Sequence, residues 1–147
     1  MSTHPIVLPT AETTAALFRE SVARNPTGEA LFWKEGKEWK SLTWQAFSDR
    51  VDAVAAALAA RGFVAGDRIA IVSENQPNWI IADLANATLG ITTVGIYPTL
   101  PPPQIAYIVN DCGAKAVFVQ DSKQLAKVLE ARKDTPSLEQ IFLFEGD

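Results

Sequence analysis

Residues 66–121 read GDRIAIVSENQPNWIIADLANATLGITTVGIYPTLPPPQIAYIVNDCGAKAVFVQD and decide the fold. Three short apolar runs, 68–72, 91–97 and 115–119, each come after a glycine. Two segments with helical character separate them, one over 77–89 that begins at Pro77 and ends at Gly90, and a shorter one over 103–109. Alternation of this kind is typical of a parallel α/β sheet. We therefore expect an α/β fold with a doubly wound, mainly parallel sheet in a Rossmann-like three-layer arrangement, and we expect 68–72 and 91–97 to be buried strands.

The sequence on either side of this stretch extends the pattern. Before it we expect a helix over 12–24, a β-hairpin of strands 31–34 and 38–42, and a helix that Thr43 caps and that ends near Arg61. Gly62 then follows that helix, at a position where a left-handed conformation is needed. After the stretch, we expect Ser122 to cap a helix that ends near Arg132, and 141–144 to form a fourth strand. Residues 1–10 are interpreted as a tail and 11–147 as one α/β subdomain.

Composition excludes several functional classes. Hydrophobic residues make up 48% of the 147 residues and charged residues 20%, which is ordinary for a globular domain. The net charge of −4 argues against nucleic acid as a partner, because phosphate binding needs clustered Lys and Arg. No apolar run is long enough for a transmembrane helix, and the N-terminus lacks the pattern of a signal peptide. With one cysteine, Cys112, the chain forms no internal disulfide, which fits a cytoplasmic location.

No pattern in the chain predicts a complete catalytic site. Neither GxGxxG nor GxxxxGK[ST] occurs, so no phosphate-binding loop is expected. His4 is the only histidine and lies in the expected tail, and Cys112 is interpreted as a small buried apolar residue. We therefore predict no catalytic, cofactor-binding or metal-binding residue within the chain.

Tyr97 and Thr99 are the two candidates for a substrate pocket. They flank Pro98 at the C-terminal end of an expected strand, the edge at which open α/β sheets bind ligands. Their hydroxyl groups would face a cleft, and the proline would make the chain rigid at that point. The alternative interpretation of the same residues is a structural turn.

Other polar residues near strand ends have structural interpretations. Glu74 and Asn75 follow the strand 68–72, where capping of the next helix is favoured over ligand binding. Asp67 and Arg68 precede and begin that strand, and we interpret them as a turn aspartate and a surface arginine. Trp79 is expected to pack its helix onto the sheet.

Four short motifs occur in a fixed order along the chain. They are LTWQAF at 42–47; GDRIAI at 66–71 with SENQPNW at 73–79; LGITTVGIYPT at 89–99; and IAYIVND at 105–111 with GAK at 113–115 and FV at 118–119. Together they resemble the N-terminal part of adenylate-forming acyl-CoA synthetases, in particular long-chain fatty-acid–CoA ligases. The chain departs from the family pattern at Ala46, where glutamate is usual, and at Gly95, where proline is more usual. The resemblance covers residues 13–147.

This resemblance implies an enzyme that activates a carboxylic acid with ATP and Mg²⁺, forms an acyl-adenylate, and transfers the acyl group to coenzyme A. Fatty acid, ATP and coenzyme A are the implied partners of the full enzyme, in the cytoplasm or peripheral to a membrane, and a homodimer is left open. The family's phosphate loop and other catalytic parts match no position in 1–147. We therefore expect an N-terminal fragment, truncated before the phosphate loop, that is not catalytic alone. The alternatives are a self-contained α/β module that binds a small ligand or a protein, and an oligomerisation domain.

Overall fold

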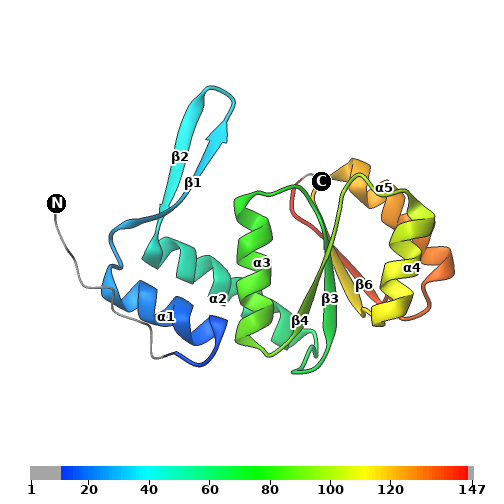
Figure 1. Ribbon diagram of the computed structural model, residues 1–147, viewed down its shortest axis with the longest axis horizontal. Coiled ribbons are helices and arrows are strands. Elements are labelled where there is room, and N and C mark those ends of the chain that lie inside the picture. The colour runs from blue at the N-terminus through cyan, green and yellow to red at the C-terminus, as the bar shows by residue number, and fades with distance from the viewer. Residues whose placement is uncertain (1–10, 146–147) are drawn as a thin grey trace.

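The computed structural model describes residues 11–145 and shows an α/β arrangement with an N-terminal helix and hairpin (Figure 1). The expected tail 1–10, with His4, lies outside the described residues. The elements in chain order are α1 (Thr14–Arg24), β1 (Glu29–Glu35), β2 (Glu38–Thr43), α2 (Trp44–Ala60), β3 (Arg68–Val72), α3 (Pro77–Thr88), β4 (Thr92–Ile96), α4 (Pro102–Cys112), β5 (Ala116–Val119), α5 (Ser122–Ala131), the 3₁₀ helix η1 (Arg132–Asp134) and β6 (Gln140–Leu143).

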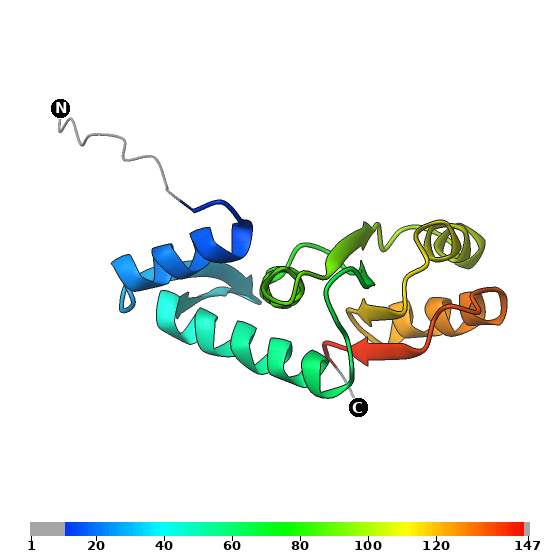
Figure 2. The same cartoon turned by 90° about the horizontal axis from the view of Figure 1, so that it is seen from below.

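The central sheet has four parallel strands in the order β4-β3-β5-β6. Side chains of β3 alternate between the two faces. Ala70 and Val72 pack in the cluster that includes residues of α4 and α5, whereas Ile69 and Ile71 pack in the cluster of α2 and α3. Helices therefore cover both faces, with α2 and α3 on one side and α4 and α5 on the other (Figure 2). The predicted doubly wound α/β fold is confirmed.

Strand β4 differs from the expectation. The sequence predicts a buried strand over 91–97, but β4 is shorter, and Ile96 is its one buried residue. The reason is topological: after β4 the chain passes β3 and returns as β5 on the other side, so that among residues 11–145 β4 is an edge strand with one neighbour. An apolar run does not reveal whether its strand is central or at an edge.

The N-terminal elements form a smaller cluster beside the sheet. The predicted Thr43 cap is confirmed, because its Oγ1 accepts a hydrogen bond from the Ala46 backbone N–H at 3.2 Å. Gly62, with φ of 86°, has the expected left-handed conformation. An Arg19–Asp52 ion pair joins α1 to α2, which bury apolar side chains, among them Phe18, against each other.

Two helix starts in the second half of the chain differ from the expectation. The residue that caps α5 is Asp121, whose carboxylate accepts from the Gln124 N–H at 2.9 Å, rather than Ser122. Helix α4 is longer than the predicted 103–109: it begins one residue earlier, at Pro102, where a missing N–H costs nothing, and it continues to Cys112. Gly113, with φ of 63°, ends this helix.

Candidate functional site

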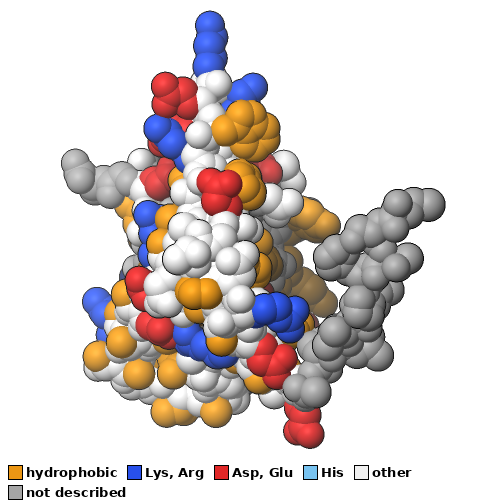
Figure 3. All heavy atoms as spheres, turned by 90° about the vertical axis from the view of Figure 1, so that its left-hand side faces the viewer, with side chains coloured by type: hydrophobic (Ala, Val, Ile, Leu, Met, Phe, Trp, Pro, Cys, Tyr) orange, Lys and Arg blue, Asp and Glu red, His pale blue; other side chains and the backbone are white. Residues whose placement is uncertain are grey.

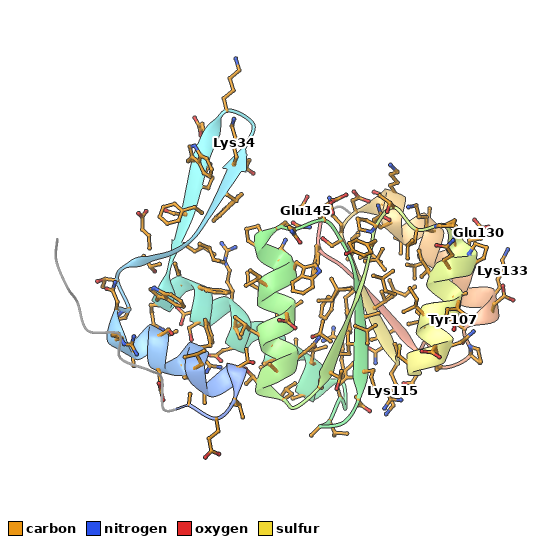
Figure 4. All side chains as sticks on the ribbon, viewed as in Figure 1. Lys34, Tyr107, Lys115, Glu130, Lys133 and Glu145 are labelled. Carbon is orange, nitrogen blue, oxygen red and sulfur yellow. The ribbon has the colours of Figure 1, made fainter. Side chains whose placement is uncertain are left out.

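The carboxyl ends of the four parallel strands lie together, and we call this side of the sheet the carboxyl edge. The opposite side, where the four strands begin, is the amino edge. Figure 4 shows Glu145, just beyond β6, at the carboxyl edge, and Lys115, just before β5, at the amino edge. Open α/β sheets bind their ligands outside the carboxyl ends of the strands, where the strand order reverses. In this chain the order reverses between β3 and β5, because β4 lies on one side of β3 and β5 on the other.

A cleft of about 260 Å³ lies at the carboxyl edge, and we call it the Trp79 cleft. Trp79 is half-buried and packs against the apolar cluster of α2 and α3. A Cβ atom at Gly95 would lie 3.6 Å from the Trp79 ring, so the absence of a side chain there leaves the indole accessible. The lining residues are Ser73, Asn75, Trp79, Gly95, Ile96 and Tyr97.

The two candidate pocket residues lie on one turn but differ in position. Tyr97 lines the Trp79 cleft and is 77% exposed. Thr99 is also exposed, and it is not among the residues that line the cleft. The Leu100 N–H donates to the Tyr97 carbonyl at 3.1 Å and closes the turn between them. The structure thus brings Tyr97 to a cleft wall and places Thr99 outside that cleft; a substrate-binding role for either residue stays a prediction.

A glutamine that sequence reasoning missed bridges the carboxyl ends of β3 and β5. Gln120 follows β5, and its Oε1 accepts from the Glu74 backbone N–H at 2.8 Å and from the Ser73 hydroxyl at 3.3 Å. The Ser73 hydroxyl in turn accepts from the Gln76 side-chain amide at 3.0 Å. The position of a polar residue directly after a buried strand was the available signal. This network connects the carboxyl ends of the two central strands.

The predicted capping role of Asn75 is wrong. The residue at the N-cap of α3 is Gln76, and it makes no side-chain capping bond. Pro77 in the first turn lacks an N–H, so this helix has one donor fewer to satisfy. The Asn75 side chain has no hydrogen-bond partner among residues 11–145; instead, it lines the Trp79 cleft.

A larger hollow of about 660 Å³ lies between the hairpin and the start of α3. Its walls are residues 32–36 of the hairpin, Arg50 of α2, residues 75–78 and Glu145. On the hairpin, Phe32 and Trp39 are 59% and 71% exposed. Figure 3 shows hydrophobic side chains exposed on the hairpin at the top of the molecule. Large exposed aromatic side chains of this kind are enriched in interaction surfaces.

The sheet face beside α2 carries a third hollow, an apolar groove of about 300 Å³. Phe118 of β5 and Phe142 of β6 form its base, with ring centroids 5.0 Å apart. The Arg61 guanidinium lies 5.7 Å from the Phe142 ring centroid, at cation–π distance. Figure 2 shows the C-terminal end of α2 beside β6.

The amino edge of the sheet contains a network of paired charges. Asp67 is buried, and its carboxylate accepts from Lys115 Nζ at 2.6 Å and from the Val64 N–H at 3.0 Å. The hydrogen bond from Lys115, and then that from Val64, hold the pKa of Asp67 below its ordinary value of 3.8, against the opposing effect of burial.

The expectation of a surface role for Arg68 is wrong. Its guanidinium donates to the carbonyl oxygens of Cys112, Gly66 and Gly113 at 2.7, 2.9 and 3.2 Å. Five fixed N–H donors allow arginine to satisfy several carbonyls at once, which here joins the end of α4 to the start of β3. Asp67 and Arg68 therefore stabilise the loops at this edge.

The described residues 11–145 contain no group of three or more His, Cys, Asp or Glu side chains that could hold a metal ion. Cys112 packs against the cluster of α4 and α5, which fits the predicted apolar role, but it is half-buried where the sequence interpretation expects it to be buried. No helix in the described range is long and apolar enough to cross a membrane.

The amino-acid sequence matches a known protein family. A family model described as AMP-binding enzyme matches residues 18–147. The chain belongs to the AMP-binding enzyme family. Human long-chain-fatty-acid–CoA ligase 6 is 30% identical over 140 residues, a match that covers 92% of this chain and 20% of the relative. The long-chain-fatty-acid–CoA ligase ACSBG1 of Rattus norvegicus is 27% identical over 129 residues, covering 88% of this chain and 18% of the relative.

Solved structures of a CoA ligase and of a fatty acyl CoA synthetase share the fold. The anthranilate CoA ligase AuaEII, in complex with anthranoyl-AMP, superposes with a TM-score of 0.83 at 24% identity, covering 93% of this chain and 26% of that one. A Mycobacterium tuberculosis fatty acyl CoA synthetase gives a TM-score of 0.80 at 20% identity, and the match covers 89% of this chain and 26% of the synthetase chain. The resemblance to adenylate-forming enzymes that the four motifs indicate is therefore confirmed. The chain spans about a fifth of the length of the curated relatives named above.

Proposed function

We propose that this chain is the N-terminal part of an ATP-dependent long-chain fatty-acid–CoA ligase. The observation that carries the proposal is the similarity to long-chain-fatty-acid–CoA ligases over about nine-tenths of the chain. In the proposed reaction a fatty acid carboxylate attacks the α-phosphorus of ATP, which forms an acyl-adenylate and releases pyrophosphate. The thiol of coenzyme A then attacks the acyl carbon, and AMP leaves.

Adenylation supplies the leaving group that the free acid lacks. A carboxylate is a poor electrophile, because its negative charge repels a nucleophile and oxide is a very poor leaving group. The proposal assigns ATP, Mg²⁺ and coenzyme A to the full-length protein. It assigns residues 11–145 the role of a scaffold whose carboxyl edge borders the substrate cleft, with Tyr97 and Thr99 as candidate substrate-pocket residues. A cytoplasmic location, with peripheral association with membranes, belongs to the same proposal.

The test is the activity of the full-length protein that carries this sequence. With palmitate, MgATP and radiolabelled pyrophosphate, we expect fatty-acid-dependent exchange of pyrophosphate into ATP, and with coenzyme A we expect palmitoyl-CoA by mass spectrometry. Acetate and benzoate are the matched acids that separate a long-chain ligase from ligases for short or aryl acids. Exchange with benzoate but not palmitate would contradict the long-chain assignment, and no exchange with any acid would contradict the ligase.

The size of the natural gene product separates the alternatives. A product several times heavier than 15.9 kDa is expected from the ligase proposal. A product of about this mass would favour a self-contained binding module or an oligomerisation domain. Sedimentation of that product, with and without palmitate, would then distinguish these two, because an oligomerisation domain self-associates without ligand.

A further inference from the structure

The turn that follows β4 is fixed on its inner side and exposed on its outer side. Pro98 is buried, and Leu100 packs against the apolar cluster of α4 and α5. Tyr97 and Thr99, which alternate with them, are exposed. A large aromatic side chain that is held on an ordered turn loses little conformational entropy when it contacts a ligand. What orders this turn therefore matters for the Trp79 cleft.

Lys127 of α5 supplies the polar contact that orders the turn. Its Nζ donates to the Pro98 carbonyl at 2.5 Å and to the Leu100 carbonyl at 3.3 Å. The side chain is half-buried, and it takes part in none of the salt bridges among residues 11–145. Within that range, no other side chain hydrogen-bonds to residues 97–100.

The geometry of these two bonds explains why a lysine suits this position. The two carbonyls belong to residues on either side of Thr99, so one ammonium group orients the backbone both before and after it. Hydrogen bonds from a charged donor are stronger than neutral ones. An apolar side chain at position 127 would fill similar space and leave both carbonyls without this donor.

We propose that Lys127 is a positioning residue that holds the Tyr97 wall of the Trp79 cleft in place from the far side of the sheet. Its effect on the backbone turn stands on the structure alone. Its effect on catalysis rests on the proposed function, because it requires that Tyr97 borders the substrate.

Three variants of the full-length protein test this proposal. Lys127→Met keeps helix propensity and an unbranched side chain, one heavy atom shorter than lysine, but removes the donor. Lys127→Arg restores a charged donor that can reach two carbonyls. Lys123→Met is the matched control, because Lys123 is exposed one turn earlier on the same helix and makes no hydrogen bond or ion pair among the described residues.

The first measurement is hydrogen exchange of a peptide that spans residues 97–100. Loss of the two charged hydrogen bonds should raise exchange at the Leu100 amide about tenfold in Lys127→Met. Lys127→Arg should restore most of the protection, and Lys123→Met should match the unmodified protein. Unchanged exchange in Lys127→Met would overturn the proposal.

The second measurement is the Michaelis constant for palmitate and for ATP in the same proteins. For Lys127→Met we expect the KM for palmitate to rise by about threefold to tenfold, with the KM for ATP unchanged and partial recovery in Lys127→Arg. Equal changes in the KM for palmitate and for ATP, without recovery in Lys127→Arg, would show that Lys127 has only a structural role and would contradict the positioning role. An unmodified protein without ligase activity would contradict the proposed function, and the exchange experiment alone would then decide on Lys127.

Discussion

The amino and carboxyl edges of the same parallel sheet differ in how their side chains are used. At the amino edge Asp67 is paired with Lys115, and Arg68 bonds three backbone carbonyls. At the carboxyl edge Tyr97 is 77% exposed, and Asn75 has no hydrogen-bond partner among residues 11–145. Polar groups that bond one another stabilise the fold, whereas polar groups left to solvent are available to a ligand. The comparison predicts large effects on stability at the amino edge and small ones at the carboxyl edge.

Arg68→Ala should give the largest loss of stability. It removes the donor from three backbone carbonyls, and we expect the free energy of unfolding to fall by roughly 2–3 kcal/mol in urea denaturation. Arg68→Lys should recover only part of this, because one ammonium cannot reach all three carbonyls. Arg50→Ala, at an exposed site, is the control. Equal effects of Arg68→Ala and Arg50→Ala would break the comparison.

Asp67→Asn should lower the free energy of unfolding by less than Arg68→Ala, and the size of the loss should depend on pH. Because the pKa of Asp67 is lowered in the folded state, its contribution is fully present above the unfolded-state value near 3.8. It is lost as the pH falls below that value toward the folded-state pKa. We expect a loss of roughly 1–2 kcal/mol at neutral pH relative to the unmodified chain, which shrinks in acid. Asp111→Asn, at an exposed residue of α4, is the control for the loss of stability at neutral pH.

Gln120→Leu tests the network at the carboxyl edge. The change removes the acceptor for the Glu74 N–H, whereas the Ser73 hydroxyl keeps the Glu74 carbonyl as an acceptor at 2.7 Å. We expect a loss of about 1 kcal/mol, less than at Arg68, because Glu74 is exposed and water can replace the lost partner. Thermal unfolding measures this loss of stability, and Gln104→Leu, at an exposed helix position, is the control. A loss as large as that of Arg68→Ala would show that the carboxyl edge is built for stability as well.

Tyr97→Ala and Thr99→Ala should have the smallest effects on stability. Both side chains are exposed, so each change should alter the free energy of unfolding by less than about 0.5 kcal/mol. If the proposed function holds, Tyr97→Ala should nevertheless raise the KM for palmitate more than Thr99→Ala, because only Tyr97 lines the Trp79 cleft. A loss of stability in Tyr97→Ala comparable to that of Gln120→Leu would favour the purely structural turn.

Local sequence signals predicted most element positions. The Thr43 cap, Gly62 at a left-handed helix end and Pro77 in a first turn follow from backbone chemistry that acts within a few residues. The predicted cap residue was wrong where two adjacent residues could serve as the cap: Asp121 caps α5 in place of Ser122. Side-chain oxygens one residue apart both suit the role, and the tertiary path of the chain selects between them.

The candidate site was only partly predictable from the sequence. Tyr97 follows an apolar run at the carboxyl end of a strand, and this pattern located it. Lys127 and Gln120 were missed because their partners lie 27 or more residues away in the sequence. Arg68 was assigned to the surface for the same reason: two of its three carbonyl partners belong to the end of α4.

The sequence by itself determined the α/β class, the order of helices and strands, and the resemblance to adenylate-forming enzymes. These follow from periodicity, end signals and short motifs, all of which are local. The tertiary structure alone decided that β4 lies at the sheet edge, that Arg68 bonds three carbonyls, and that Lys127 holds the Tyr97 turn. Each of these depends on which distant segments the crossovers bring side by side, and hydrophobic patterning does not specify that choice.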